Sequence, residues 1–212
     1  NKPITKLLLK LPCEAVILCP GDEKKLFALH FDDIETKLAL HRFAWLSEFG
    51  ENVPTDWVAA IWQAWVKKYS RVDNSWAWHP YTVAERAVNI ISFIERYGIP
   101  GSVEQTLNIL KIHALAIINR LEYFGDHHTS NHLANNGRGL YLLGLALGLK
   151  QTTNIGGRIL IEEAKRIFHS SGILREGSSH YHLLLARNFK EVADAAKKYN
   201  RKEETSLKSV AN

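Results

Sequence analysis

Hydrophobic residues recur at helical spacing along most of this chain. The clearest case follows Thr55, which suits a helix N-cap. Its apolar positions follow the spacing of a single buried stripe: Val58, Ile61, Trp62, Trp65, Val66 and Tyr69. From about Asp32 onward, segments of helix length carry similar patterns and end near Gly, Pro or polar clusters. The pattern therefore predicts a series of helices, with little room for strands.

Further helices are predicted over residues 80–97, 102–125, 130–148, 155–171 and 178–199. Pro80 lies in a first turn, where its missing N–H costs nothing, and Gly98 follows the helix end. Ser102 and Gln105 fit a capping box. Short connections between long helices favour antiparallel neighbours. We expect an all-α fold of stacked antiparallel helical hairpins, arranged as a bundle, a solenoid or a closed or partly closed α/α toroid.

The two ends of the chain differ from this pattern. Residues 1–31 contain two short apolar runs, separated by Pro12 and closed by Pro20 and Gly21, which predict short strands or an extended arm. Residues 201–212 are rich in Lys, Glu and Ser and predict a polar tail or linker. The helical domain is therefore expected over residues 32–200.

Composition narrows the functional classes. The 212 residues are 46% hydrophobic, enough for an ordinary domain core, but no apolar stretch reaches the roughly 20 residues that cross a bilayer. Cys13 and Cys19 have neither the number nor the spacing of a disulfide framework or metal site. The net charge of +5 favours an acidic partner, either nucleic acid or acidic polysaccharide. The positive residues are scattered, so we expect no nucleic acid.

The ten histidines are unevenly distributed. Five of them gather in two turns: His127, His128 and His132 in the first, and His180 and His182 in the second. One interpretation makes His128 and His132 metal ligands, with a histidine of the second turn as the third. The pair lacks the Glu of the zinc-peptidase motif. The alternative is that Thr129 or Ser130 caps the helix and the histidines are solvated.

The second turn places Tyr181 between two histidines. Nearby cationic groups favour the ionised phenol, so this tyrosine could exchange protons with a substrate. It could equally lie at an interface, with its ring buried and its hydroxyl in water. A third segment, residues 76–81, is rich in aromatic side chains and precedes Glu85 and Arg86. Such aromatics stack on sugars or fill a core.

Taken together, these segments resemble the heparinase II/III-like family of polysaccharide lyases. The resemblance rests on three motifs that occur in the order found in the family: Trp78-His79-Pro80-Tyr81 with Ala84-Glu85-Arg86, Ser130-Asn131-His132-Leu133-Ala134-Asn135-Asn136 with Gly139-Leu140 and Gly144, and Arg175-Glu176-Gly177-Ser178-Ser179-His180-Tyr181-His182. It implies an α/α toroid, incomplete in this chain, and a C-terminal β-sandwich domain of the same polypeptide. An acidic polysaccharide would bind in the cleft between these two domains.

The resemblance also implies a reaction, the β-elimination of a uronate-containing chain. Asn131 and His132 match the pair that neutralises the uronate carboxylate, and Tyr181 matches the tyrosine that moves protons. The substrate-binding residues would be His79, Tyr81, Arg86, Glu176 and His182. Arg86 would act as a carboxylate clamp or as an ion-pair partner of Glu85 or Glu176. A further histidine is expected from the β-sandwich domain, and no cofactor or metal is implied.

The resemblance therefore favours a bacterial, periplasmic or secreted polysaccharide lyase. Two other functions stay open. One is a carbohydrate-binding module that keeps the helical fold without catalysis. The other is a metal-dependent glycan hydrolase that uses the histidine clusters.

Overall fold

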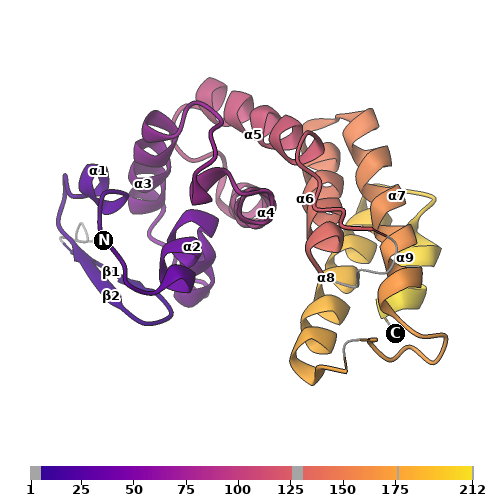
Figure 1. Cartoon of the computed structure of the whole chain (residues 1–212). Helices are drawn as coiled ribbons and strands as arrows, with labels where there is room; N and C mark the ends of the chain where they lie inside the picture. Colours follow the sequence, from indigo (N-terminus) through magenta and orange to yellow (C-terminus); the bar gives the residue numbers. More distant parts are fainter. Residues whose placement is uncertain (1–5, 126–130, 176, 212) are drawn as a thin grey trace. The chain divides into compact units, whose positions relative to one another are not determined.

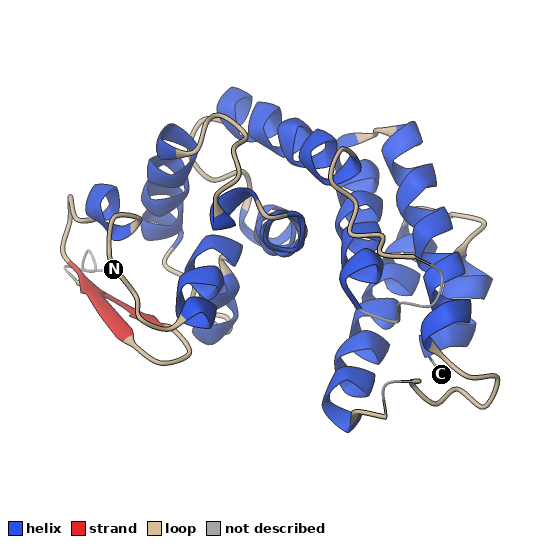
Figure 2. Cartoon of the chain, in the orientation of Figure 1, coloured by secondary structure: helices blue, strands red, loops and turns tan. Residues whose placement is uncertain are grey.

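The computed structural model describes residues 6–125, 131–175 and 177–211. The chain forms two compact units, Asn1–His113 and Ala114–Asn212, and each is described by itself. The described residues are mainly helical, and the strands lie near the N-terminus (Figure 2). The predicted fold class, helical hairpins with a short β-like segment at the start, is therefore confirmed.

The N-terminal unit begins with a β-hairpin of β1 (Leu7–Lys10) and β2 (Ala15–Leu18), which pair antiparallel with Leu7 opposite Leu18. Side chains of a strand point alternately to its two faces, so Leu7 and Leu9 are buried while Leu8 and Lys10 are exposed. The helical part follows (Figure 1): α1 (Glu23–Leu26), α2 (Ile34–Arg42), η1 (Ala44–Phe49), α3 (Thr55–Lys68), η2 (Trp76–Trp78), α4 (Pro80–Tyr97) and α5 (Val103–Ile118). Helix α5 continues across the division between the units.

The core of the N-terminal unit is dominated by aromatic rings. Helix α3 buries the predicted stripe, with Tyr69 half-buried at its end. The indoles of Trp62 and Trp65 stack with their centroids 5.6 Å apart, and Trp78 is also fully buried. The aromatic loop of residues 76–81 is therefore partly core, because Trp78 is enclosed while Trp76 is 46% exposed.

The C-terminal unit consists of α6 (Asn131–Leu147), α7 (Lys150–Ile167), α8 (Ser179–Lys198) and α9 (Glu204–Ala211). Gly148 and Leu149 alone separate α6 from α7, so these two helices pack as an antiparallel hairpin. Helix α8 packs on α6 and α9 and runs in the same direction as α6 (Figure 1). Arg138 Nε of α6 donates to Glu191 Oε2 of α8 at 2.7 Å and ties these helices together.

The prediction of a polar tail was wrong for most of its length. Residues 204–211 form α9, which packs on α8 and α7. Leu207 is fully buried there. One well-placed leucine, with Glu203 and Arg201 paired just before the helix, gives an otherwise polar segment a buried face.

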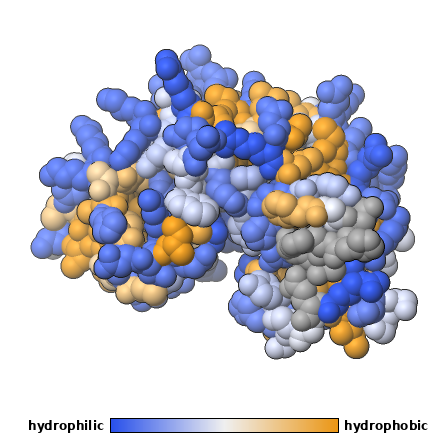
Figure 3. Space-filling view, in the orientation of Figure 1, coloured by the Kyte–Doolittle hydropathy of each residue, from blue (hydrophilic) through white to orange (hydrophobic). Residues whose placement is uncertain are grey.

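The surface is mainly hydrophilic, with apolar patches between the polar side chains on the face shown in Figure 3. Scattered exposed apolar side chains are normal on a protein surface. Among the helices of the described residues, none combines the length and the apolar character that a membrane crossing requires.

Candidate functional site

The first turn of α6 carries two of the predicted catalytic residues. Asn131 is the first residue of the helix and His132 the second, and both are partly exposed. The N–H groups of a first helical turn have no partner within the helix, and the helix dipole is positive at this end. The position therefore suits a bound carboxylate, which an Asn amide and a His ring can contact as donors.

A buried carboxylate holds His132. Glu122 lies in the loop before α6 with its side chain only 7% exposed, and its Oε1 is 2.7 Å from His132 Nδ1. Its other oxygen, Oε2, accepts from Asn136 Nδ2 at 3.0 Å. The backbone N–H of Glu122 donates to Asn136 Oδ1, also at 3.0 Å. Glu122 therefore connects the first turn of α6 to the second through two side-chain contacts.

Tyr181 lies in the first turn of α8. Ser178 caps this helix, and its Oγ accepts from the backbone N–H of Tyr181 at 3.4 Å. The side chain of Tyr181 is 43% exposed, and its ring packs edge-on against His180 with the centroids 5.6 Å apart. A substrate can therefore reach this tyrosine from solvent.

The first turns of α6 and α8 lie at the same end of the C-terminal unit. The two helices run in the same direction (Figure 1), and the Arg138 to Glu191 pair fixes how far one is shifted along the other. Helix α7 ends there too, where Arg166 Nη2 donates to the carbonyl of Gly125 at 2.6 Å. Asn131, His132 and Tyr181 are thus brought to one end of this unit from two helices.

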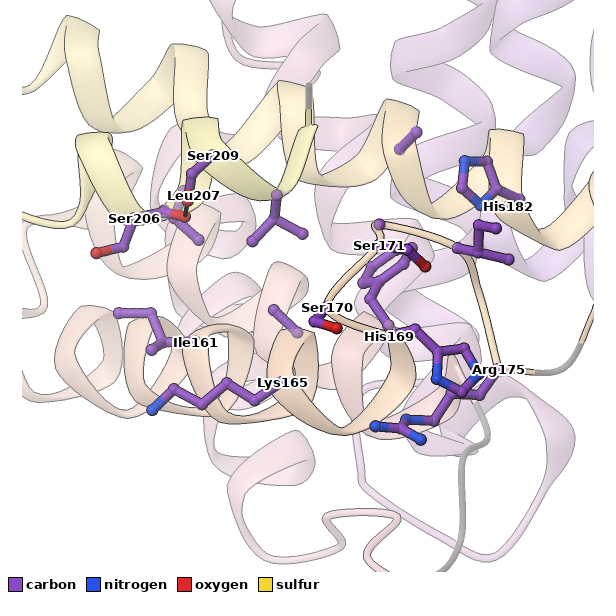
Figure 4. Close-up of a pocket in the computed structure, with 16 residues that line it drawn as sticks. Ile161, Lys165, His169, Ser170, Ser171, Arg175, His182, Ser206, Leu207 and Ser209 are labelled. Carbon is purple, nitrogen blue, oxygen red and sulfur yellow. Dashed lines mark hydrogen bonds between the residues drawn. The ribbon is translucent and has the colours of Figure 1, made fainter.

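His182 faces a different part of the same unit. Its ring contacts Phe168, with the centroids 6.0 Å apart, and it lines a cavity of about 910 Å³ between α7, the following loop, α8 and α9 (Figure 4). His169 and Arg175 lie at one end of this cavity, and Ser206 and Ser209 at the other. The lining combines basic and hydroxyl side chains with apolar ones such as Ile161, Phe168 and Leu207. Glu176 lies outside the described residues.

The remaining predicted substrate-binding residues belong to the N-terminal unit. His79 directly precedes α4 and its ring contacts the ring of Trp76 at 5.4 Å. The ring of Tyr81 lies beneath the guanidinium of Arg42, 5.0 Å from its carbon atom. Both side chains are half-buried and keep some surface for a ligand.

Arg86 is fully buried. Its Nε donates to His113 Nε2 at 2.8 Å, and its Nη1 donates to the carbonyls of His41 and Ala77 at 3.0 and 2.9 Å. The guanidinium carbon lies 3.9 Å from the ring centroid of Trp65. These contacts differ from both predicted roles, the carboxylate clamp and the ion pair with a glutamate. Arg86 instead joins α2, α3, α4 and α5 in the core.

The surroundings of Arg86 keep two histidines neutral. Burial, reinforced by the charges of Arg86, Lys37 and Lys68, lowers the pKa of His41 to about 3. Burial and the Arg86 charge also lower the pKa of His113 well below its usual range. Burial lowers the pKa of Arg86 itself. Neutral His113 matches its two contacts, because one ring nitrogen accepts from Arg86 and the other donates to the carbonyl of Ile109.

The metal-site interpretation finds no support in the part of the chain that is described. No group of three His, Cys, Asp or Glu side chains within residues 6–125, 131–175 and 177–211 could hold a metal ion. His127, His128, Thr129 and Ser130, on which the metal and capping interpretations both depended, lie outside the described residues. Cys13 and Cys19 are exposed thiols.

Glu122 was not predicted as a site residue from the sequence, and no role was predicted for Asn136. Glu122 comes ten positions before His132 and lies in a loop, so no helical spacing links these two residues in the sequence. The only sign in the sequence is a single acid among apolar neighbours, Leu121 before it and Tyr123 and Phe124 after it. Asn136 belongs to the second motif and lies one helical turn after His132, on the same face of α6.

Solved structures with a similar fold include a heparan sulfate lyase and a heparinase III gene product. The crystal structure of the heparan sulfate lyase HepC from Pedobacter heparinus matches with a TM-score of 0.71 and 16% identity, over 98% of this chain and 35% of that one. A mutant of that enzyme matches with a TM-score of 0.70, again at 16% identity, over 98% and 36%. A heparinase III gene product with methylated lysines matches with a TM-score of 0.59 and 18% identity, over 89% and 35%.

The chain thus spans about a third of the length of these lyases. A comparison with curated proteins found no match. The family model described as the heparinase II/III N-terminus matches residues 23–210, which is nearly all of the chain. The chain therefore belongs to the heparinase II/III family and corresponds to its N-terminal region.

Proposed function

We propose that this chain is the helical part of a polysaccharide lyase that cleaves an acidic, uronate-containing polysaccharide by β-elimination. The observation that carries the proposal is the arrangement at one end of the C-terminal unit. An amide and an imidazole held by a buried carboxylate lie in the first turn of α6, and an accessible phenol lies in the first turn of α8. The family and its lyase structures support the same function.

The reaction begins with a proton that is hard to remove. It sits on the carbon beside the uronate carboxylate, and its removal pushes charge into that carboxylate. Hydrogen bonds from Asn131 and His132 would offset this charge, as preorganised donors do for an oxyanion. The helix dipole at the start of α6 would act in the same direction.

Tyr181 would move the protons. As an ionised phenol it takes the proton from the carbon, the electron pair forms a double bond to the neighbouring carbon, and the bond to the glycosidic oxygen breaks. That oxygen leaves with a proton, which the phenol can return as a general acid. The products are a chain with an unsaturated uronate at its new end and a chain with a new hydroxyl.

The proposal extends to the rest of the protein. The structural relatives are about three times as long, so we infer that a β-sandwich domain of the same polypeptide closes the site and supplies a further histidine. Since acidic polysaccharides of this kind lie outside the cytoplasm, we propose a periplasmic or secreted location. His79 and Tyr81 would also bind the polysaccharide.

The test uses the full-length protein and a panel of acidic glycans. Unsaturated uronate absorbs in the ultraviolet, so lyase action appears as an absorbance gain. Tyr181→Phe should lower this rate about a hundredfold or more, the usual contribution of a general acid or base. Tyr199→Phe is the matched control, because Tyr199 is 40% exposed at the other end of α8 and should keep the full rate.

Each alternative has its own outcome. A panel without any absorbance gain, together with glycan binding that survives Tyr181→Phe, would replace the lyase by a carbohydrate-binding module. Glycan cleavage without unsaturated product, abolished by a chelator, would indicate the metal-dependent hydrolase.

A further inference from the structure

We propose that Glu122 is a positioning residue that fixes the ring of His132, with Nδ1 turned inward and Nε2 presented to the substrate carboxylate. The role of Nε2 rests on the proposed function. The orientation of the ring rests on the geometry alone, so the two parts can fail separately.

The geometry identifies the donor and the acceptor. A carboxylate only accepts hydrogen bonds, so the 2.7 Å contact between Glu122 Oε1 and His132 Nδ1 requires a proton on Nδ1. Nδ1 then points into the protein. Nε2 lies across the ring from this contact, and the His132 side chain as a whole is 43% exposed.

Asn136 fixes Glu122 in turn. The backbone N–H of Glu122 donates to Asn136 Oδ1, which sets the orientation of that amide. The Asn136 NH2 group must then face Glu122 Oε2, as observed at 3.0 Å. His132, Glu122 and Asn136 therefore form one chain of hydrogen bonds. Exchanging the donor and the acceptor in one of these hydrogen bonds would break the next one.

The consequence for binding follows from the protonation of the ring. A proton on Nδ1 leaves Nε2 of a neutral ring as an acceptor, which does not suit a carboxylate. A uronate carboxylate at Nε2 would therefore bind to the doubly protonated ring. The ring would then lie between two negative charges, those of Glu122 and the uronate. His132 would then offset the charge of the substrate as a cation, which is stronger than a neutral donor.

Glu122→Gln tests this arrangement with a minimal change of shape. Because Asn136 offers a donor, the side-chain oxygen of the new amide is held at Asn136 and its NH2 group faces His132. Nδ1 must then accept, so the proton of the neutral ring moves to Nε2. Nitrogen chemical shifts of 15N-histidine in the full-length protein, recorded at alkaline pH, distinguish the two forms. The signal of His132 is assigned by its loss in His132→Gln.

The expected result is a parent ring protonated at Nδ1 and a Glu122→Gln ring protonated at Nε2. Glu203→Gln is the matched control, because Glu203 is 8% exposed like Glu122 but pairs with Arg201 beside α9. It should leave the His132 signals unchanged. A parent ring protonated at Nε2 would overturn the proposal, and so would an unchanged ring in Glu122→Gln. The parent spectrum decides even where the variant does not fold.

Kinetics test the second part. If Nε2 contacts the carboxylate, Glu122→Gln should lower kcat about tenfold or more and change KM less, because charge on the carboxylate grows in the transition state. Glu203→Gln should keep both constants. If the proton moves to Nε2 in Glu122→Gln but the parent protein has no lyase activity, the proposed function is wrong and the proposed orientation of the ring stands. An unchanged kcat in an active Glu122→Gln enzyme would show that His132 Nε2 does not stabilise the charge on the substrate carboxylate.

Discussion

Glu122 and Arg86 are both buried charges, but their partners differ in kind. Glu122 receives hydrogen bonds from an imidazole and an amide that lie toward a helix start. Arg86 donates to a neutral histidine and to backbone carbonyls and lies over the face of Trp65. Within the described residues its Nη2 has no hydrogen-bond partner. The first arrangement fixes side chains at the start of one helix, whereas the second joins several helices.

Asn131→Asp should separate function from stability. The change keeps the size of the side chain but replaces the donating amide by a carboxylate, which repels the carboxylate of a bound uronate. We expect kcat/KM to fall about a hundredfold or more, as for a lost oxyanion donor. The melting temperature should stay the same or rise slightly, because an acid at a helix start is stabilising by about 0.3–1 kcal/mol.

Asn131→Gln provides the control, since it keeps an amide at this position and should retain part of the activity. Full activity in Asn131→Asp would show that this residue does not contact the carboxylate. Thermal unfolding of the three proteins, alongside the ultraviolet assay, is sufficient for the comparison.

At the scale of single residues, the sequence predicted what local patterns can show. Asn131, His132 and Tyr181 stood out because they belong to histidine-rich turns and to motifs of a family. The burial of Arg86 could not be read from its own helix, because His41, Trp65 and His113 come from three other helices. Glu122 was missed for the same reason, since its partners lie beyond a loop.

Helices were predicted well where apolar periodicity continued to their ends. Residues 80–97 form α4 as predicted. Helix α7 was expected from residue 155 but begins at Lys150, because the polar run before it was interpreted as a loop. Thr152 and Thr153 are in fact buried, and Thr153 lies against Gly144 of α6. Small side chains at a close helix contact are polar in sequence but belong to the core.

The contact between α6 and α7 makes a prediction at this scale. A Cβ atom added at Gly156 would collide with the backbone of Tyr141 and with the carbonyl of Gly137, neither of which can move aside alone. Gly156→Ala should therefore lower the free energy of unfolding by about 1–3 kcal/mol, the usual cost of overpacking. Chemical unfolding followed by circular dichroism measures the change.

Gly157→Ala is the neighbouring control. Its added Cβ meets the ring of Tyr141 at 3.3 Å, a side chain that can shift. The better helix propensity of Ala, up to about 1 kcal/mol, offsets this contact. Equal losses in the two variants would contradict a backbone clash specific to Gly156.

At the scale of the whole molecule, the division at His113 was not visible in the sequence. Helix α5 runs across it without a break, so no Pro, Gly or polar linker marks the boundary. The all-α fold class could be predicted from the apolar periodicity. The division into two units could not, because it depends on which helices, distant in the sequence, share a core. The six tryptophans provide a convenient probe, because all of them lie between residues 45 and 78, in the N-terminal unit.

Tryptophan fluorescence should show that the N-terminal unit loses stability in mild acid. His41 and His113 are neutral in the folded state, where their pKa values lie below the usual range, while in the unfolded chain they protonate near pH 6.5. The unfolded state therefore binds more protons as the pH falls from about 6.5 toward the folded values. Each histidine then removes about 1.4 kcal/mol of stability per pH unit, and the two together about 2.7.

The pH window separates this effect from that of the carboxylates. Hydrogen bonds from Thr36 lower the pKa of Asp33, so the stability it provides is present above its usual value of 3.8 and is lost only below it. Between about pH 6.5 and 4.5 the slope should therefore come mainly from the histidines. His113→Gln should remove about half of the slope, whatever it does to the stability at neutral pH. His30→Gln should leave the slope unchanged, because the side chain of His30 is 91% exposed. A parent protein whose unfolding free energy is flat across this window would show that these histidines are not held neutral.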